Sequence, residues 1–273
     1  MSMEGSYKSE RQPLGLEGEL ERLKAQARVI WKKELRTLGW FGLEDGMAIL
    51  EAGSGPGFVT ELLLNAFPKS TVTALENDPT LVERAKNYLT IHGYEYYEIV
   101  ERSVTDTGLA ENSFDFAYAR FLYQHLPDPV AATQELFRVL KPGGVLVVHD
   151  RDSGLKALRA PENPLIEQIY MQAAEQQTAW GGSPKVGRKL WQILSEVGFV
   201  ELDLELLAIH SDANDVESVS WLRPEIVERG IREGWSSAEQ GRILLEALST
   251  VNNSPDKYVL QPNILVGGRK PLP

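Results

Sequence analysis

The sequence predicts a doubly wound α/β fold, in which a mostly parallel β-sheet carries helices on both of its faces. Between about residues 47 and 150, short apolar segments typical of buried strands alternate with segments whose apolar residues recur every three or four positions. This alternation places consecutive strands parallel to one another, with the connecting helices packed against the sheet. With 273 residues, the chain is long enough to bury such a sheet between two helical layers.

The predicted elements follow one another along most of the chain. Strands are predicted over residues 47–51, 70–76, 96–102, 114–119, 145–149, 200–209 and 258–268. Helices are predicted over residues 16–38, 58–67, 79–92, 128–140, 164–179 and 187–197, and a helical insert with several breaks over residues 216–250. Pro79 suits a first helical turn, Gly93 a helix end, and Pro262 an edge or a bulge of the last strand.

The domain organisation that we expect is an N-terminal helical cap over residues 1–44 and one α/β domain over residues 45–273. Less regular segments at about residues 153–185 and 212–256 are interpreted as a helical lid on that domain. Aromatic residues in or near the lid suit a small, partly apolar ligand, although aromatic residues at helical spacing also occur in cores. These residues are Tyr170, Trp180, Trp191, Trp221 and Trp235.

The composition excludes several classes of site and partner. A formal net charge of −11 disfavours nucleic acid and anionic membrane surfaces as partners. The absence of cysteine excludes disulfides, thiolate metal sites and cysteine nucleophiles, and it fits a cytoplasmic protein. No apolar run reaches the roughly 18–20 residues that a membrane span needs, so no membrane association is expected. The oligomeric state does not follow from these observations.

A glycine-rich turn is the most informative segment. Residues 49–58 have the sequence Ile-Leu-Glu-Ala-Gly-Ser-Gly-Pro-Gly-Phe and lie between a predicted strand and a predicted helix, where doubly wound sheets bind ligands. The dinucleotide fingerprint G-x-G-x-x-G needs a glycine at position 58, but this chain has Phe58 there. The tighter spacing of Gly53, Gly55 and Gly57 leaves less room for a pyrophosphate and better suits a ligand whose amino-acid part passes over the loop.

Glu76 is the second anchor, because it ends the next predicted strand about 20 residues after the glycine turn. A carboxylate at this place can accept hydrogen bonds from both hydroxyls of a ribose. A solvated acid at a strand end is the alternative. The glycine turn upstream favours the ribose.

With these anchors, the chain resembles the class I S-adenosylmethionine (SAM)-dependent methyltransferase family from about residue 45 to residue 150. The motifs that carry the resemblance are residues 49–57, residues 72–79 (Val-Thr-Ala-Leu-Glu-Asn-Asp-Pro), residues 112–116 (Asn-Ser-Phe-Asp-Phe) and residues 136–144 (Leu-Phe-Arg-Val-Leu-Lys-Pro-Gly-Gly). The resemblance implies a Rossmann-like sheet of seven strands, the last antiparallel, with SAM as cofactor and S-adenosylhomocysteine (SAH) as product.

The resemblance also implies cofactor-binding roles for individual residues. Glu51 and Gly53 would lie beside the methionine part of SAM, Glu76 would hold the ribose, and Asn77 would flank the adenine. Where the family usually has an acid for the adenine amino group, this chain has Ser103, and Asp106 could replace it if the loop shifts. Arg120 would face the SAM carboxylate, unless it forms a surface ion pair. The implied set is Glu51, Gly53, Ser54, Gly55, Gly57, Glu76, Asn77, Ser103, Val104 and Arg120.

Methyl transfer from a sulfonium needs an in-line approach of the acceptor and needs a general base only if the acceptor carries a proton. The candidate bases are His125, after the fourth predicted strand, and Asp150, at the end of the fifth. His125 could instead have a packing or loop-fixing role, and Arg151 and Asp152 could pair with each other. We expect no metal site, since His149, Asp150 and Asp152 lack the spacing of a known ligand set.

The function that we predict is SAM-dependent methyl transfer to a small-molecule acceptor. The acidic charge and the helical insert favour it, because inserts at this place commonly form the acceptor pocket in the family. A protein or RNA methyltransferase, a non-catalytic SAM-binding regulator or scaffold, and an NAD-dependent dehydrogenase are the alternatives. The last is disfavoured by Phe58. The acceptor and its reacting atom stay open.

Overall fold

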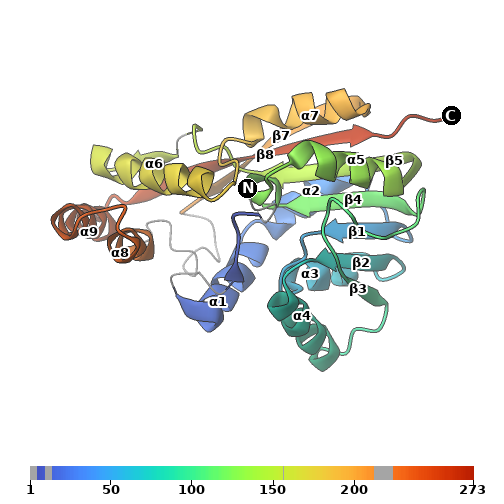
Figure 1. Ribbon diagram of the computed structural model, residues 1–273, viewed down its shortest axis with the longest axis horizontal. Helices are drawn as coiled ribbons and strands as arrows, with labels where there is room; N and C mark the ends of the chain where they lie inside the picture. Colours follow the sequence, from blue (N-terminus) through green and yellow to red (C-terminus); the bar gives the residue numbers. More distant parts are fainter. Residues whose placement is uncertain (1–4, 10–13, 156, 212–223) are drawn as a thin grey trace.

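The computed structural model describes residues 5–9, 14–155, 157–211 and 224–273, which form one mixed sheet of eight strands flanked by helices (Figure 1). The strands are β1 (Ala48–Ala52), β2 (Thr71–Glu76), β3 (Tyr97–Glu101), β4 (Phe114–Arg120), β5 (Leu140–Asp150), β6 (Leu158–Ala160), β7 (Val200–His210) and β8 (Tyr258–Arg269). The α-helices are α1 (Gly15–Arg28), α2 (Trp31–Trp40), α3 (Phe58–Ala66), α4 (Pro79–Ile91), α5 (Pro129–Val139), α6 (Pro164–Ala179), α7 (Leu190–Val197), α8 (Pro224–Glu233) and α9 (Ala238–Asn252).

The strand order is β3-β2-β1-β4-β5-β8, with β6 and β7 both paired to β8. The pairs among β1 to β5 are parallel, whereas β8 runs antiparallel to β5, β6 and β7. The carboxyl ends of β1, β2 and β4 therefore meet at one edge of the sheet. These observations confirm the predicted doubly wound, mostly parallel α/β fold.

The short strand β6 is the difference from the expected seven strands. Leu260 of β8 pairs with His210 of β7 and also with Leu158 of β6, so these two strands lie on opposite edges of β8. On the edge that carries β6, the pairing of β8 with β5 starts only at Ile264. Pro262 lies in the gap between these two pairings, which agrees with its predicted place at an irregular part of the strand.

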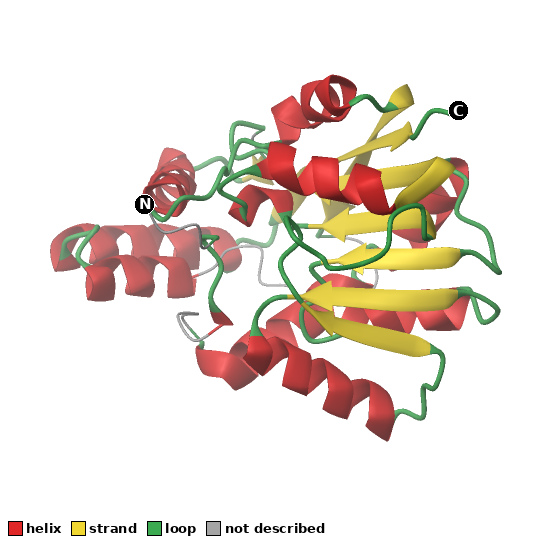
Figure 2. Ribbon diagram, turned by 45° about the vertical axis from the view of Figure 1, so that its right-hand side comes forward, coloured by secondary structure: helices red, strands yellow, loops and turns green. Residues whose placement is uncertain are grey.

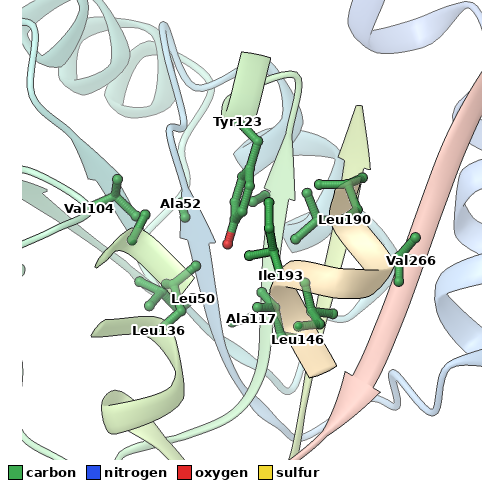
Figure 3. Packing of buried hydrophobic residues seen from close by; sticks show 14 of the residues in the cluster. Leu50, Ala52, Val104, Ala117, Tyr123, Leu136, Leu146, Leu190, Ile193 and Val266 are labelled. Carbon is green, nitrogen blue, oxygen red and sulfur yellow. The ribbon is translucent and has the colours of Figure 1, made fainter. Parts of the chain in front are cut away.

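Helices cover both faces of the sheet (Figure 2), and an apolar cluster lies on each face. In β1, Ile49 packs on one face, while Leu50 and Ala52 pack on the other, as the two-residue period of a strand requires. Helices α5 and α7 contribute to the cluster of Leu50, and α1 to α4 to the cluster of Ile49. Tyr123 is fully buried in the first cluster, and its hydroxyl lies 2.9 Å from that of Thr133 (Figure 3).

The single helix predicted over residues 16–38 is wrong, because the chain forms two helices there. The backbone leaves the helical region at Ile30, where φ is −123°. Side chains on both sides of the break, Ala27, Ile30 and Leu38, are buried in the same apolar cluster on the sheet.

Helices α6, α8 and α9 pack on one another beyond the carboxyl ends of the parallel strands (Figures 1 and 2). Their buried side chains form a separate apolar cluster of Ile166, Ile169, Val227, Leu244, Leu248 and Val251. The part of the predicted lid at residues 212–223 lies outside the described residues. None of the described helices is both long and apolar enough to cross a membrane.

Candidate functional site

A cavity of about 450 Å³ lies at the carboxyl ends of β1, β2 and β4. The glycine turn, the ends of these strands, the N-terminal segment, α1, α6 and α8 all contribute to its walls. The sequence-predicted residues that line it are Glu51, Gly53, Ser54, Gly55, Glu76, Asn77, Ser103, Val104, Arg120 and His125. Gly57 and Asp150 are not among the lining residues. The structure thus brings most of the predicted set to one cavity.

The glycine turn bends sharply between β1 and α3. Its three glycines have positive φ values, and Gly57, at +83°, is the N-cap of α3. A Cβ atom on Gly57 would lie 3.2 Å from the Cβ of Ala85, and one on Gly53 would lie 3.0 Å from the Leu122 side chain. Both positions therefore require glycine, for the backbone conformation and for the close packing.

The backbone N–H groups of this turn are already used within the protein. Gly53 and Ser54 donate to the carbonyl oxygen of Leu75 at 2.8 and 3.0 Å. Gly55 donates to Oε2 of Glu76 at 2.8 Å, and Gly57 donates to the carbonyl oxygen of Ser54 at 3.2 Å. A phosphate-binding loop needs N–H groups that point at the anion. The turn therefore offers a ligand close backbone contact rather than a phosphate cradle.

Glu76 is buried at the cavity wall, and both of its carboxylate oxygens are held. Besides Gly55, the N–H groups of Asn77 and Asp78 donate to Oε1 at 2.8 and 2.9 Å. Burial raises the pKa of Glu76, while the three backbone donors oppose that rise. The side chain is fixed beside the glycine turn, where a ribose hydroxyl could bind it.

Glu51 is a second carboxyl group at the cavity, 3% exposed. Its Oε2 accepts a hydrogen bond of 2.5 Å from the Thr60 hydroxyl on α3. Burial raises the pKa of Glu51 to about 8, against the lowering effects of Thr60 and of the Arg120 charge. The group therefore carries a proton at neutral pH, and a nearby cation would favour its ionised form.

The loop after β3 forms another part of the wall. Arg102, Ser103, Val104 and Thr105 line the cavity, but Asp106 does not. The Ser103 hydroxyl lies 2.8 Å from that of Thr105. In the structure, therefore, the two hydroxyls and not the Asp106 carboxylate are the side-chain groups that this loop offers to an adenine.

Arg120 ends β4 and is held by a buried ion pair. Its Nε and one terminal nitrogen donate to Glu34 of α2 at 2.6 and 3.1 Å, and the same terminal nitrogen donates to the Gln26 carbonyl oxygen at 2.8 Å. The side chain is 7% exposed, so the ion pair lies in the interior rather than at the surface. Since Arg120 still lines the cavity, its predicted contact with the SAM carboxylate stays a prediction.

His125 lines the cavity and contacts the N-terminal segment. Its Nδ1 lies 2.9 Å from the Ser6 hydroxyl, and its ring meets the Tyr7 ring edge-on at 5.4 Å between centroids. Burial, together with the charges of Arg22 and Arg151, lowers the pKa of His125 to about 4. The imidazole is therefore neutral at pH 7, so it can accept a proton but is a weak base.

Asp150 is fully buried and accepts hydrogen bonds from the backbone after β4 and β5. Its carboxylate accepts hydrogen bonds from the N–H groups of Gln124 and Arg151 at 3.0 and 2.7 Å. Burial raises its pKa to about 7. Because Asp150 is not a lining residue, this geometry gives it a loop-fixing role and leaves its catalytic role a prediction.

The sequence also allows Arg151 and Asp152 to pair with each other. In the structure, Asp152 pairs with Arg188, 2.6 Å away, and accepts a further hydrogen bond from the Arg188 backbone N–H. Arg151 lies over the Phe121 ring, with its guanidinium carbon 4.6 Å from the ring centroid, and it lines the cavity.

The lid helices supply the wall opposite the glycine turn. Tyr170, Trp180 and Trp235 line the cavity, whereas Trp191 is 45% exposed on α7 and does not. Trp221 lies outside the described residues. Arg229 of α8 lies over the Trp180 ring at 4.3 Å and donates to Glu233 at 2.8 Å. This wall is aromatic with one fixed cation.

Sequence reasoning missed three arginines of the cavity wall, Arg22, Arg102 and Arg229. Arginines on amphipathic helices are typical of solvated faces, and no local motif distinguishes Arg22 or Arg229 from such residues. The buried partner of Arg120, Glu34, was missed for the same reason. Only contacts between segments distant in sequence reveal these residues.

The side chains around the cavity fit SAM. Ser54 Oγ is buried there without a hydrogen-bond partner among the described residues, so it is an available acceptor and donor. Glu76 and Glu51 suit a diol and a cation, and Arg120 suits a carboxylate. The cavity volume is within the range of roughly 300–1,000 Å³ of small-molecule sites. Among the described residues, no group of acids and histidines is arranged to hold a metal ion.

Comparisons with known proteins show methyltransferases among the proteins similar to this chain. Residues 50–148 match a family described as a methyltransferase domain. The chain is 28% identical over 190 residues to a trans-aconitate 2-methyltransferase of Methylobacterium radiotolerans, a match that covers 66% of this chain and 68% of that protein. It is 34% identical over 110 residues to a sterol 24-C-methyltransferase of Aspergillus fumigatus, covering 40% of this chain but only 29% of that enzyme.

Solved structures share the fold at low sequence identity. A phosphoethanolamine N-methyltransferase of Haemonchus contortus, solved with SAH and phosphomonomethylethanolamine, superposes with a TM-score of 0.58 at 17% identity, covering 88% of this chain and 53% of that one. A SAM-dependent methyltransferase of Aquifex aeolicus gives a TM-score of 0.53 at 21% identity, covering 70% and 90% of the two chains. At these identities the structures show a shared fold, while the motif order and the family match over residues 50–148 support a class I SAM-dependent methyltransferase.

Proposed function

We propose that this protein transfers the methyl group of SAM to a small-molecule acceptor in the cavity at the carboxyl ends of β1, β2 and β4. The observation that carries the proposal is the fixed carboxylate of Glu76 beside a glycine turn whose N–H groups are already bonded. That pairing suits an adenosyl group with an amino-acid tail and not a pyrophosphate. Bound SAM would supply an electrophilic methyl group on a sulfonium.

The residues of the chain would bind and orient the two reactants. Glu76 would hold the ribose, and Asn77, Ser103 and Val104 would border the adenine. Glu51 and Arg120 would face the methionine end. Positioning of the acceptor in line with the methyl group is the main requirement, and it needs no catalytic triad. His125 would accept a proton only from an acceptor that carries one.

The acceptor would bind between the loop after β4 and the lid helices. Tyr170, Trp180 and Trp235 offer apolar surfaces, while Gln124 and Gln177 offer polar groups. We further propose that residues 1–44 act as a cap and residues 153–185 and 212–256 as a lid, of which residues 212–223 lie outside the described part. Trans-aconitate, the substrate named for one relative, is a first compound to assay.

The charge and composition bear on the class of substrate and on the cellular location of this activity. A net charge of −11 disfavours nucleic acid as substrate, and the lack of cysteine supports a cytoplasmic location. The proposal makes no use of a metal ion or of a membrane.

Calorimetric titration with SAM, SAH and NAD tests the proposal. We expect SAM and SAH to bind and NAD not to bind. Glu76→Ala should weaken SAH binding at least ten-fold, because the ribose hydroxyls lose an acceptor that is fixed in place. Glu98→Ala is the matched control, since Glu98 is an exposed carboxylate on neighbouring β3 and should leave the affinity unchanged.

Release of SAH in the presence of candidate small acids, amines and phenols then tests catalysis. Binding of NAD in place of SAM, or SAH binding that is indifferent to Glu76→Ala, would contradict the proposed site. Methylation of a protein or an RNA instead of small molecules would contradict the proposed acceptor class.

A further inference from the structure

Glu34 is a buried carboxylate of α2 that lies beneath the cavity and outside every motif of the sequence. Its side chain has no exposed surface. Three side chains meet its Oε1 atom: Arg120 Nε at 2.6 Å, His149 Nδ1 at 2.6 Å and the Tyr118 hydroxyl at 2.8 Å. These partners come from the ends of β4 and β5, so one residue of the N-terminal helix pair joins two strands at the cofactor edge of the sheet.

The protonation states of this cluster follow from its geometry. Burial alone would raise the pKa of Glu34, but the charge of Arg120 and the hydrogen bonds from Arg120 and His149 lower it to about 2. A carboxylate can only accept hydrogen bonds, so Nδ1 of His149 carries the proton. Burial lowers the pKa of His149, so its ring is neutral at pH 7. The one full positive charge that Glu34 holds in this cluster is therefore Arg120.

Glu34 fixes two of the three guanidinium nitrogens of Arg120. Nε and Nη2 donate to the carboxylate, and Nη2 also donates to the Gln26 carbonyl oxygen of α1. Nη1 has no hydrogen bond to any of the described residues, and the side chain lines the cavity. The Phe121 ring lies 4.9 Å from the guanidinium carbon and limits its movement on another side. The guanidinium is thus held rigidly, with one N–H₂ group left for a ligand.

From this geometry we propose that Glu34 is a positioning residue, which holds Arg120 so that its remaining nitrogen binds the carboxylate of the methionine part of the cofactor. The inference rests on the proposed function. It makes α2 a part of the cofactor site, although Glu34 itself is not among the residues that line the cavity. A guanidinium that is already ordered loses little conformational entropy when it binds a carboxylate.

The test compares two ligands that differ in the amino-acid part. SAH carries the carboxylate, whereas 5′-methylthioadenosine has the same adenosyl thioether without it. In Glu34→Gln, calorimetry should show about ten-fold weaker binding of SAH and a change of less than about two-fold for 5′-methylthioadenosine. A merely structural role of Glu34 would weaken both ligands alike and would overturn the inference.

Glu61→Gln is the matched control. Glu61 is also a buried carboxylate with an arginine and a tyrosine as partners, Arg28 at 3.3 Å and Tyr88 at 2.7 Å, but it does not line the cavity. We expect both ligands to bind Glu61→Gln as they bind the parent protein. Loss of SAH affinity in this control equal to that in Glu34→Gln would count against a specific role of Glu34.

A double-mutant cycle with Arg120→Met shows whether Glu34 acts through Arg120. Once the guanidinium is removed, Glu34→Gln should cause no further loss of SAH affinity. An equal loss in both backgrounds would overturn the inference. If the parent protein binds 5′-methylthioadenosine and SAH equally, the carboxylate is not bound at all and the inference fails while the adenosine site stands. If neither ligand binds, the proposed function itself fails.

Discussion

At the scale of single residues, burial raises the pKa of both carboxyl groups at the cavity, but the two groups receive different numbers of hydrogen bonds. Glu76 receives three backbone N–H groups, which stabilise its charge where burial opposes it. Glu51 receives one hydroxyl, and burial dominates, so that it is protonated at neutral pH. The surroundings of the two carboxyl groups therefore stabilise the charged form to different degrees, because the numbers of hydrogen-bond donors differ.

The pKa of Glu51 predicts how stability depends on pH in the absence of ligand. The folded-state pKa of about 8 lies above the ordinary 4.5, so the folded protein binds this proton more tightly than the unfolded chain does. Its contribution to stability is therefore complete below pH 4.5 and is lost as the pH rises to about 8. Glu51→Gln cannot ionise, so its stability relative to the parent protein should grow over this range, by on the order of 3 kcal/mol.

Denaturant unfolding of both proteins at pH 5 and at pH 8.5 measures this difference. The comparison of the two proteins cancels the titration of all other groups. A stability difference that stays the same at both pH values would show that Glu51 is ionised throughout, contrary to this prediction.

The residues that sequence reasoning found are those whose signal is local. Gly53, Gly57 and Glu76 lie at fixed spacings at the ends of two strands, and a turn that needs positive φ is visible in the sequence. Glu34 has no such signal, because it lies 86 positions from its partner Arg120. A lone glutamate on a helix is normally solvated, and only the packing of α2 under the sheet makes it part of the site.

At the scale of elements, the lid helices form a cluster of their own. The buried side chains of α6, α8 and α9 contact one another and not the two clusters of the sheet. This cluster is small, so we expect it to open more easily than the sheet, as elements with few buried contacts do. Acceptor binding would then depend on the lid more than cofactor binding does.

Leu248→Ala tests this separation. Removing most of a fully buried leucine side chain should destabilise the cluster by about 2–4 kcal/mol. Hydrogen exchange measured by mass spectrometry should become faster in α6, α8 and α9, while the affinity for SAH changes less than about two-fold. Leu136→Ala, in the main core, is the control, and it should speed exchange throughout the sheet. Equal effects of the two variants would contradict an independent lid.

The boundaries of the elements were predictable where side chains cap or interrupt them. Asp78 and Asp128 accept hydrogen bonds from the N–H groups of the first turns of α4 and α5, which begin at prolines as predicted. The break at Ile30 and the short strand β6 were not predictable. The helical spacing of apolar residues continues across the break, and β6 forms by pairing with a strand about 100 residues away.

At the scale of the whole molecule, the strand order sets the position of the cavity. Because β1 lies between β2 and β4, the glycine turn, Glu76 and Arg120 come together although they are distant in sequence. The alternation of strands and helices makes the strands parallel, and the order of the strands in the sheet determines where the site lies. The parallel sheet, a ligand site after its first strand and a lid built from the inserts were predicted, whereas the strand order and the contacts between the inserts were not, because the inserts have no repeating pattern.

A ligand that binds only the folded chain raises its stability by mass action. At a free SAH concentration of 100 times the dissociation constant, the gain is about 2.7 kcal/mol. For a chain of this size, the melting temperature should rise by roughly 5–10 °C. Differential scanning calorimetry with SAH, and with NAD at the same concentration as control, measures the effect. A rise with NAD as large as that with SAH would contradict the proposed cofactor.

The occupied amides of the glycine turn limit how this fold could be redesigned. Phe58→Gly would create the spacing of the dinucleotide fingerprint, but the N–H groups of Gly53, Ser54 and Gly55 would still donate to Leu75 and Glu76. A diphosphate would meet the glycine spacing of the fingerprint, but these three N–H groups would already be bonded within the protein. A change of cofactor from SAM to a dinucleotide would therefore require that the turn separate from the end of β2. No single substitution in the motif would break these backbone hydrogen bonds.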